Sequence, residues 1–218
     1  MKKFVIIGLG SFGSNLVKVL SKNDTEIIAI DNNESKVNEI KDLVTQPITM
    51  DATNKENLKT LNLDDVDAVI VSMGKSLEPS ILTVHIIKEL GVKKIIAKAL
   101  SEDHEKILRL VGATEVTYPE KDIAEKIGNR LTYANMVDYL PLESGLVLQE
   151  IAAPDAFVGK SLAEIDLRKK YNVTVIAIKS IIPEQTIANP SGDFIIKESD
   201  ILLVLGQNED IAKLHKRS

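Results

Sequence analysis

The sequence predicts an α/β protein in which a Rossmann-like, doubly wound parallel sheet is followed by a small α+β module. Through about residue 118, short apolar runs alternate with amphipathic stretches, a pattern typical of a parallel sheet covered by helices on both faces. A G-x-G-x-x-G turn at residues 8–13 directly follows the first apolar run. From about residue 145 the alternation is replaced by short apolar runs separated by turns. We therefore expect one domain over residues 1–140 and a second over residues 141–218.

The first domain should contain strands and helices in strict alternation. Its strands are predicted from continuous apolar runs at residues 4–7, 27–31, 47–50, 67–72, 94–98 and 115–118. Its helices are predicted from the amphipathic stretches between them, at residues 12–22, 34–43, 55–61, 78–90 and 103–111. Gly91 and Gly112 stand where the last two helices should end, a position that glycine favours.

A further helix is predicted after the sixth strand, because Pro119 suits a first helical position and three apolar residues follow at helical spacing: Ile123, Ile127 and Leu131. Pro141 is expected to end this helix, and residues 139–142 are expected to form a hinge between the two modules. The second module should contain strands at residues 146–151, 173–178 and 201–205, and a final helix within residues 207–216.

The glycine turn is typical of a dinucleotide site because each glycine meets a separate requirement. Gly8 permits a tight turn, Gly10 lets the backbone approach a pyrophosphate, and Gly13 lets the following helix pack close to the sheet. The helix then directs free N–H groups and a partial positive charge at the phosphate. The alternative is a Rossmann sheet whose crevice holds no ligand.

Polar side chains stand at the carboxyl ends of several predicted strands, where open α/β sheets bind their ligands. Asp31 ends the second strand, and its carboxylate can accept hydrogen bonds from a ribose diol while repelling a 2′-phosphate. It therefore favours NAD or an adenine nucleotide over NADP. Asp51, Ser72 and Lys98 end the third, fourth and fifth strands at the same edge.

Composition excludes several classes of function. The formal net charge is −5 with the signs well mixed, so the chain carries no electrostatic footprint for nucleic acid or anionic lipid. Cysteine is absent, which excludes disulfides, thiolate metal sites and a cysteine nucleophile. No apolar run approaches the roughly 18 residues of a membrane span, and the N-terminus leads directly into the first strand. We expect a cytoplasmic protein without a signal peptide, whose membrane role would need a separate partner.

Several of these motifs together resemble the RCK family, also called KTN, whose members regulate potassium transport. In the first domain they are Gly8-Leu9-Gly10 with Phe12-Gly13, Asp31 with Asn33, Asp51-Ala52-Thr53, and Tyr118-Pro119-Glu120-Lys121-Asp122. In the second they are Asp166-Leu167-Arg168 before Tyr171, and the run from Asp200 to Gly206, which resemble the RCK_C module. The likeness covers essentially the whole chain and is greatest to the soluble Trk/Ktr-type regulatory subunit.

The resemblance implies a regulatory subunit rather than an enzyme. It implies an RCK_N lobe that binds ATP, ADP or NAD(H) and dimerises partly through the helix after the sixth strand. It further implies rings, often octamers, docked on the cytosolic face of a membrane-embedded potassium transporter. In some relatives cyclic di-AMP binds between two RCK_C modules.

The resemblance also assigns residues. Gly8, Gly10, Ser11, Phe12 and Gly13 match the phosphate loop, Asp31 and Asn33 lie near the adenosine, and Asp51, Ala52 and Thr53 match a further motif of the lobe. Lys98 would reach phosphate, Glu120 would help to bind a cation at the dimer contact, and Arg168 matches the cyclic di-AMP pocket. The alternative for Lys98 is a solvated surface lysine. The alternative for Glu120 is an acid that only interacts with the helix dipole, and the alternative for Arg168 is a surface arginine. Many ATP-responsive relatives carry arginine where this chain has Ser11, which makes NAD(H) or AMP-like ligands more plausible here.

Two other function classes remain open from the sequence. An NAD-dependent oxidoreductase would need an acid or base near the nicotinamide, whereas the histidines (His85, His104 and His215) all fall within helical patterns. A free-standing nucleotide sensor acting on a partner other than a transporter would use the same fold.

Overall fold

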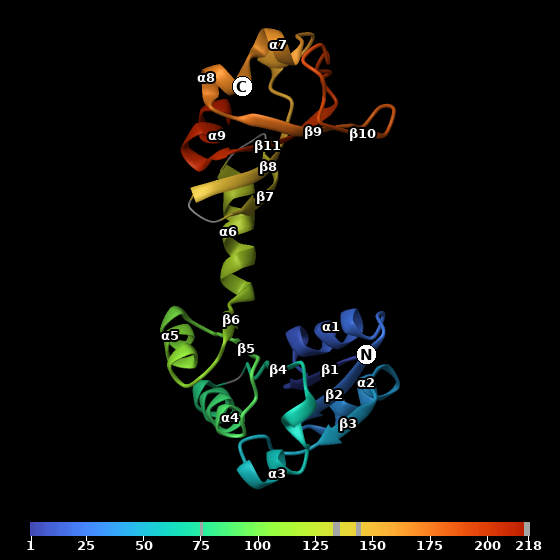
Figure 1. The fold of residues 1–218 in the computed structure, drawn as a ribbon, viewed down its shortest axis with the longest axis vertical. Helices are drawn as coiled ribbons and strands as arrows, with labels where there is room; N and C mark the ends of the chain where they lie inside the picture. The colour runs from blue at the N-terminus through green and yellow to red at the C-terminus, as the bar shows by residue number, and fades with distance from the viewer. Residues whose placement is uncertain (75, 133–135, 143–144, 216–218) are drawn as a thin grey trace. The chain divides into compact units, whose positions relative to one another are not determined.

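The computed structural model describes residues 1–74, 76–132, 136–142 and 145–215. Its internal contacts divide the chain into two compact units, Met1–Lys121 and Asp122–Ser218, whose elements are labelled in Figure 1. The expected domain boundary after residue 140 stays a prediction.

The first unit is built on a parallel sheet in the strand order β3-β2-β1-β4-β5-β6. The predicted doubly wound fold and each predicted strand position are confirmed, with ends shifted by one or two residues. The bounds are β1 Lys2–Ile7, β2 Thr25–Asp31, β3 Gln46–Thr49, β4 Ala68–Val71, β5 Ile95–Lys98 and β6 Glu115–Thr117.

The predicted helices between these strands are also confirmed. Their bounds are α1 Ser11–Leu20, α2 Glu34–Ile40, α3 Lys55–Lys59, α4 Leu77–Glu89 and α5 Glu102–Leu110, with 3-10 turns at η1 Lys41–Leu43 and η2 Leu63–Asp65. Three of them begin at a residue whose side chain accepts a hydrogen bond from a main-chain N–H of the first turn: Asn33 at α2, Asn54 at α3 and Ser101 at α5.

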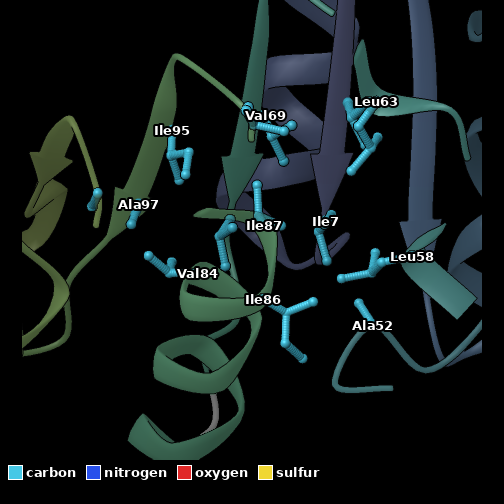
Figure 2. Packing of buried hydrophobic residues seen from close by; sticks show 14 of the residues in the cluster. Ile7, Ala52, Leu58, Leu63, Val69, Val84, Ile86, Ile87, Ile95 and Ala97 are labelled. Carbon is cyan, nitrogen blue, oxygen red and sulfur yellow. The ribbon is translucent and has the colours of Figure 1, made fainter. Parts of the chain in front are cut away.

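Hydrophobic residues cover both faces of this sheet because successive strand side chains point to opposite sides. Ile6 of β1 belongs to a core with α1 and α2, whereas its neighbours Val5 and Ile7 belong to a core with α3, α4 and α5. Figure 2 shows the second core, in which Val84 and Ile87 of α4 pack against the sheet. The helix that follows β1 and the helix that follows β4 thus cover opposite faces of the sheet, and the separation of the two helix starts opens a crevice at the carboxyl ends of these strands.

The second unit contains an antiparallel sheet in the order β10-β9-β11-β8-β7. Its strands are β7 Met136–Pro141, β8 Leu146–Ala152, β9 Thr174–Ser180, β10 Gln185–Ala188 and β11 Asp200–Gln207. Its helical elements are η4 Asp155–Phe157, α7 Leu162–Ile165, α8 Leu167–Tyr171 and α9 Asn208–His215. The three predicted strands and the final helix are confirmed, whereas β7 and β10 were not predicted.

The helix after β6 differs from the prediction at its C-terminal end. α6 spans Pro119–Thr132, and residues 136–141 form β7, which pairs with β8 from Met136↔Ile151 to Pro141↔Val147. The expectation that Pro141 ends the helix is wrong: Pro141 lies at the end of a strand, a position where its missing N–H is tolerated. Residues 139–141 are part of this strand, and the expected hinge at residues 139–142 stays a prediction.

Candidate nucleotide-binding site

A cavity of about 590 Å³ opens at the carboxyl edge of the parallel sheet. It is lined by the glycine turn and by the ends of β2, β3, β4 and β5. Most of the residues predicted for the site are among those lining it: Gly8, Gly10, Ser11, Phe12, Asp31, Asn33, Asp51, Ala52, Thr53 and Lys98. The sheet topology thus brings together side chains that lie up to 90 residues apart in the sequence.

The glycine turn packs so closely that two of its positions exclude any side chain. Gly8 has a φ of +95°, and a Cβ there would lie 2.5 Å from the carbonyl oxygen of Ser72. A Cβ on Gly13 would lie 2.0 Å from the carbonyl oxygen of Gly8, so Gly13 supports the turn from below and does not line the cavity. At Gly10, nothing lies within 4 Å of the Cβ position, so the backbone there is open to the cavity.

Two helices begin at the cavity without a side-chain cap. Gly10, which has no side chain, precedes α1, and Ser76, whose side chain makes no capping hydrogen bond, precedes α4. Both residues line the cavity. In contrast, side chains of Asn33, Asn54 and Ser101 cap α2, α3 and α5. Free N–H groups at a helix start, together with the helix dipole, favour an anion such as phosphate.

Asp31 ties two loops together inside the cavity. Its Oδ2 accepts a hydrogen bond of 2.7 Å from the N–H of Leu9, and its Oδ1 accepts one of 2.9 Å from the N–H of Asn33. The ammonium of Lys36 also lies 3.4 Å from Oδ2. A carboxylate offers about four lone-pair sites, so a ribose hydroxyl can still bind, or can replace Lys36. Asp31 therefore holds the glycine turn in place as well as offering a ribose acceptor.

The turn after β3 forms a second wall. Asp51 Oδ1 accepts hydrogen bonds from the hydroxyl of Thr53 at 2.7 Å and from its N–H at 2.9 Å. These two hydrogen bonds hold the pKa of Asp51 below its ordinary value, so this carboxylate stays ionised at neutral pH. The intervening Ala52 is buried, and its carbonyl accepts a hydrogen bond from Thr83 of α4.

Lys98 and Glu120 form an ion pair at the edge of the cavity. The Nζ of Lys98 lies 2.5 Å from Oε1 of Glu120, which belongs to the first turn of α6. The Lys98 side chain is 13% exposed and lines the cavity, whereas the Glu120 side chain is 60% exposed. The hydrogen bond from Lys98 lowers the pKa of Glu120 below its usual range.

The family of the chain follows from two matches that together cover most of its length. The TrkA-N domain matches residues 4–119, and the TrkA-C domain matches residues 146–218. This chain belongs to the TrkA family. Its similarity to the Ktr system potassium uptake protein C of Bacillus subtilis is 39% identity over 216 residues, covering 99% of this chain and 97% of that protein. It is also 34% identical to the Ktr system potassium uptake protein A of the same organism, over 97% of this chain and 95% of that protein.

Solved structures show the same fold. The RCK domain of GsuK superposes with a TM-score of 0.68 at 17% identity, covering 99% of this chain and 47% of that one. The GsuK channel bound to NAD superposes with a TM-score of 0.56 at 24% identity, covering all of this chain and 38% of that one. The resemblance to the RCK family expected from the motifs is thereby confirmed. In the described part of this TrkA-family chain, none of the helices combines the length and the apolar character that a membrane crossing requires.

Two predicted residues of this TrkA-family chain are placed without their roles being tested. Arg168 is an exposed residue of α8 in the second unit and is not part of the cavity. Glu120 is bonded to Lys98, and within the described residues no three His, Asp or Glu side chains gather to hold a metal ion. Binding of cyclic di-AMP by Arg168 and of a cation by Glu120 both stay predictions.

The described histidine side chains do not line the cavity. His104 of α5 is fully buried, and His85 of α4 is half exposed. The prediction for the side chain of His215 falls outside the described residues. The relatives of the chain are named for potassium uptake rather than for catalysis.

Sequence reasoning missed several cavity residues, among them Lys36, Met50, Met73, Ser76 and Pro79. Lys36 lies in the first turn of α2, five residues after Asp31, and this spacing could have indicated a side chain directed back at Asp31. Ser76 and Pro79 flank the start of α4, which follows β4 just as α1 follows β1. The symmetry of the two strand–helix turns was the signal available.

Proposed function

We propose that the chain is the nucleotide-binding regulatory subunit of a potassium uptake system, and that binding in the cavity changes the conformation of an oligomer docked on a membrane transporter. The observation that carries this proposal is the cavity itself, where the glycine turn and Asp31 lie at the carboxyl edge of a doubly wound sheet. The relatives named as Ktr potassium uptake proteins support the transport role.

The cavity suits an adenine nucleotide in size and chemistry. Its volume of about 590 Å³ lies within the roughly 300–1,000 Å³ of small-molecule sites. Asp31 and Asn33 would hold the ribose and adenosine, while the starts of α1 and α4 would receive phosphate. Lys98 would add a cation at the phosphate end.

Charge favours a ligand with few negative charges. Among the described residues that line the cavity, the cations are Lys36 and Lys98, and each is already paired with a carboxylate. Ser11 supplies a hydroxyl where arginine would supply a charged fork. We therefore rank NAD(H) and AMP-like ligands above ATP and ADP, in keeping with the GsuK channel that was solved with NAD.

Self-association is supported by two apolar surfaces. Three exposed side chains recur at four-residue spacing along α6: Ile123, Ile127 and Leu131. On the first unit, a groove of about 500 Å³ beside α1 is lined by Phe4, Phe12, Leu16, Leu20, Ile70 and Ile96 and rimmed by charged residues. A ridge with this spacing suits such a groove, so we infer that α6 of a second copy occupies it, within dimers that build a ring of eight.

The membrane partner would be a separate potassium-translocating protein, with this chain on its cytoplasmic side. A second ligand site would lie around Arg168 on α8, where Lys169 and Lys170 follow and where cyclic di-AMP would bind. The first site does not depend on the second.

A calorimetric titration of the purified protein with ATP, ADP, AMP, NAD, NADH and NADP tests the cavity directly. We expect binding of at least one adenine nucleotide without 2′-phosphate, and we expect Lys98→Gln to weaken it. The matched control is Lys106→Gln, which removes an exposed lysine of α5 that is likewise paired with a carboxylate but lies outside the cavity. If none of the six nucleotides binds, or if both variants bind as the wild type does, the assignment fails.

The second site and the rival functions are tested in the same preparation. Arg168→Ala should abolish binding of cyclic di-AMP while sparing the cavity ligand, and Lys179→Ala, at an exposed lysine of β9, serves as its control. Steady turnover of NADH with a carbonyl substrate would favour the oxidoreductase. Failure to bind a potassium transporter from the same organism, despite nucleotide binding, would favour the free-standing sensor.

A further inference from the structure

A buried chain of hydrogen bonds joins the loop after β5 to the start of α4. The N–H of Leu100 donates to Nδ1 of His104 at 3.2 Å, and Nε2 of His104 lies 2.9 Å from the hydroxyl of Ser80. The hydroxyl of Ser80 in turn donates to the carbonyl of Leu77 at 2.9 Å, in the first turn of α4. His104 and Ser80 are both fully buried.

The chemistry of this chain sets the state of the histidine. An N–H can only donate, so Nδ1 of His104 must be unprotonated, and Nε2 must carry the proton that it donates to Ser80. Burial lowers the pKa of His104, which keeps this neutral form. Every polar atom of the two side chains is then used, and none is available for proton transfer or for a metal.

Both ends of the chain adjoin the cavity. Leu100 follows Lys98 by two residues, and Leu77 stands between Ser76 and Pro79. A second buried hydroxyl, that of Thr83, joins α4 to the carbonyl of Ala52 in the turn after β3. α4 is thus held near its start through Ser80 and one turn later through Thr83, and both anchors lead to residues that adjoin or line the cavity.

We propose that His104 is a positioning residue of the nucleotide site, which through Ser80 holds the uncapped start of α4 at the distance from Lys98 that a bound phosphate requires. This role rests on the proposed function and adds to it a residue that touches no ligand. A histidine suits the position because one ring nitrogen can accept from the loop after β5 while the other donates to α4. Serine suits its partner because a hydroxyl both accepts and donates.

The test compares nucleotide affinity with stability in four variants. Ser80→Ala removes the link to α4, His104→Asn keeps an acceptor for Leu100 but cannot reach Ser80, and His104→Gln can reach Ser80 but leaves the N–H of Leu100 without its acceptor. Ile87→Val, in the same helix two turns further along, is the matched control, because it trims a buried side chain that takes no part in the hydrogen bonds of His104 and Ser80. We call the other three the relay variants. Affinity is measured by calorimetric titration with the nucleotide that binds the wild type most tightly, at a temperature where all variants are folded. Hydrogen exchange is followed at residues 80–83, the first amides of α4 with acceptors inside the helix, and at Leu100.

We expect the relay variants to bind about five- to tenfold more weakly, as the loss of a buried hydrogen bond implies, and to exchange faster at residues 80–83. Ile87→Val should lower the thermal midpoint but leave the affinity unchanged. Relay variants that bind as tightly as the wild type would overturn the positioning role while leaving the proposed function intact. Equal weakening in Ile87→Val would also overturn it, by showing that lost stability alone weakens binding. A wild type that binds no nucleotide would overturn both proposals.

Discussion

The carboxylate of Asp31 accepts hydrogen bonds from the main chain of two loops, so its removal changes the shape of the cavity as well as its chemistry. Asp31→Ala leaves the buried N–H of Leu9 without its acceptor, which costs about 1–3 kcal/mol of stability. It also removes the ribose acceptor, so we expect nucleotide affinity to fall about tenfold or more. Asp31→Asn keeps one oxygen and should cost less stability while still weakening binding. Urea unfolding and calorimetric titration of both variants separate these effects, and unchanged affinity in both would contradict the ribose assignment.

Gly10 and Gly13 allow the two tasks of the turn to be separated by a single methyl group. Gly13→Ala would place its Cβ 2.0 Å from a backbone oxygen, so we expect a loss of about 1–3 kcal/mol or more in the free energy of unfolding. Gly10→Ala meets nothing within 4 Å and should fold with a similar stability to the wild type, but its methyl would occupy the path of the phosphate. The two are compared by urea unfolding and by titration with nucleotide. Normal binding by Gly10→Ala would show that phosphate does not approach the turn there.

At the scale of elements, the central strands of the parallel sheet were predictable because both of their faces are buried. All residues of β4 and of the inner part of β2 are buried. Short continuous apolar runs that alternate regularly with helical patterns are typical of parallel strands. β10 is an edge strand of four residues with no buried side chain. β3 is equally exposed, but the strict alternation of strands and helices located it, and β10 lies outside that alternation. β7 was missed because the pattern predicts a helix that ends at Pro141, although proline is also tolerated in an edge strand such as β7.

The apolar stripe of α6 leads to a prediction about association. Ile127→Asp puts a charge in the middle of the stripe, whose burial against a partner would contribute about 1.5–3 kcal/mol per side chain. We expect the variant to remain folded, because Ile127 is half exposed, and to dissociate toward monomers in analytical ultracentrifugation. Asn129→Asp, which adds the same charge to a different face of α6, should assemble normally. An Ile127→Asp variant of wild-type mass would exclude α6 from the interface.

At the scale of the whole molecule, the sequence predicted where the site lies better than how it is connected. Residues at the carboxyl edge were predictable because the backbone topology alone brings the ends of parallel strands to one edge of the sheet. The pairs formed by Lys36 with Asp31 and by Lys98 with Glu120 were not, because they depend on how far each helix start is turned toward the sheet. The hydrogen bonds of His104 were hidden for the same reason: a histidine within a helical pattern gives no sign of its partner on another helix.

The two units have separate hydrophobic cores, which predicts that nucleotide acts on one of them. A ligand at 100 times its dissociation constant stabilises the unit that holds it by about 2.7 kcal/mol. Scanning calorimetry should therefore show one transition that rises with nucleotide and one that stays in place, and Asp31→Asn should reduce the rise. An equal rise of both transitions would show instead that the units unfold together.

The ammonium group of Lys98 takes part in two places: Lys98 lines the cavity, and it pairs with Glu120 in the first turn of α6. A phosphate that recruited Lys98 would leave a bare carboxylate at the start of α6. A cation or protein surface that bound Glu120 would release Lys98 and so change the affinity for phosphate. Thermodynamic linkage is reciprocal, so bound phosphate would change the affinity of that cation or surface for Glu120 by the same factor. The cavity would then report on what surrounds α6, and a nucleotide titration would measure an event taking place outside the binding site.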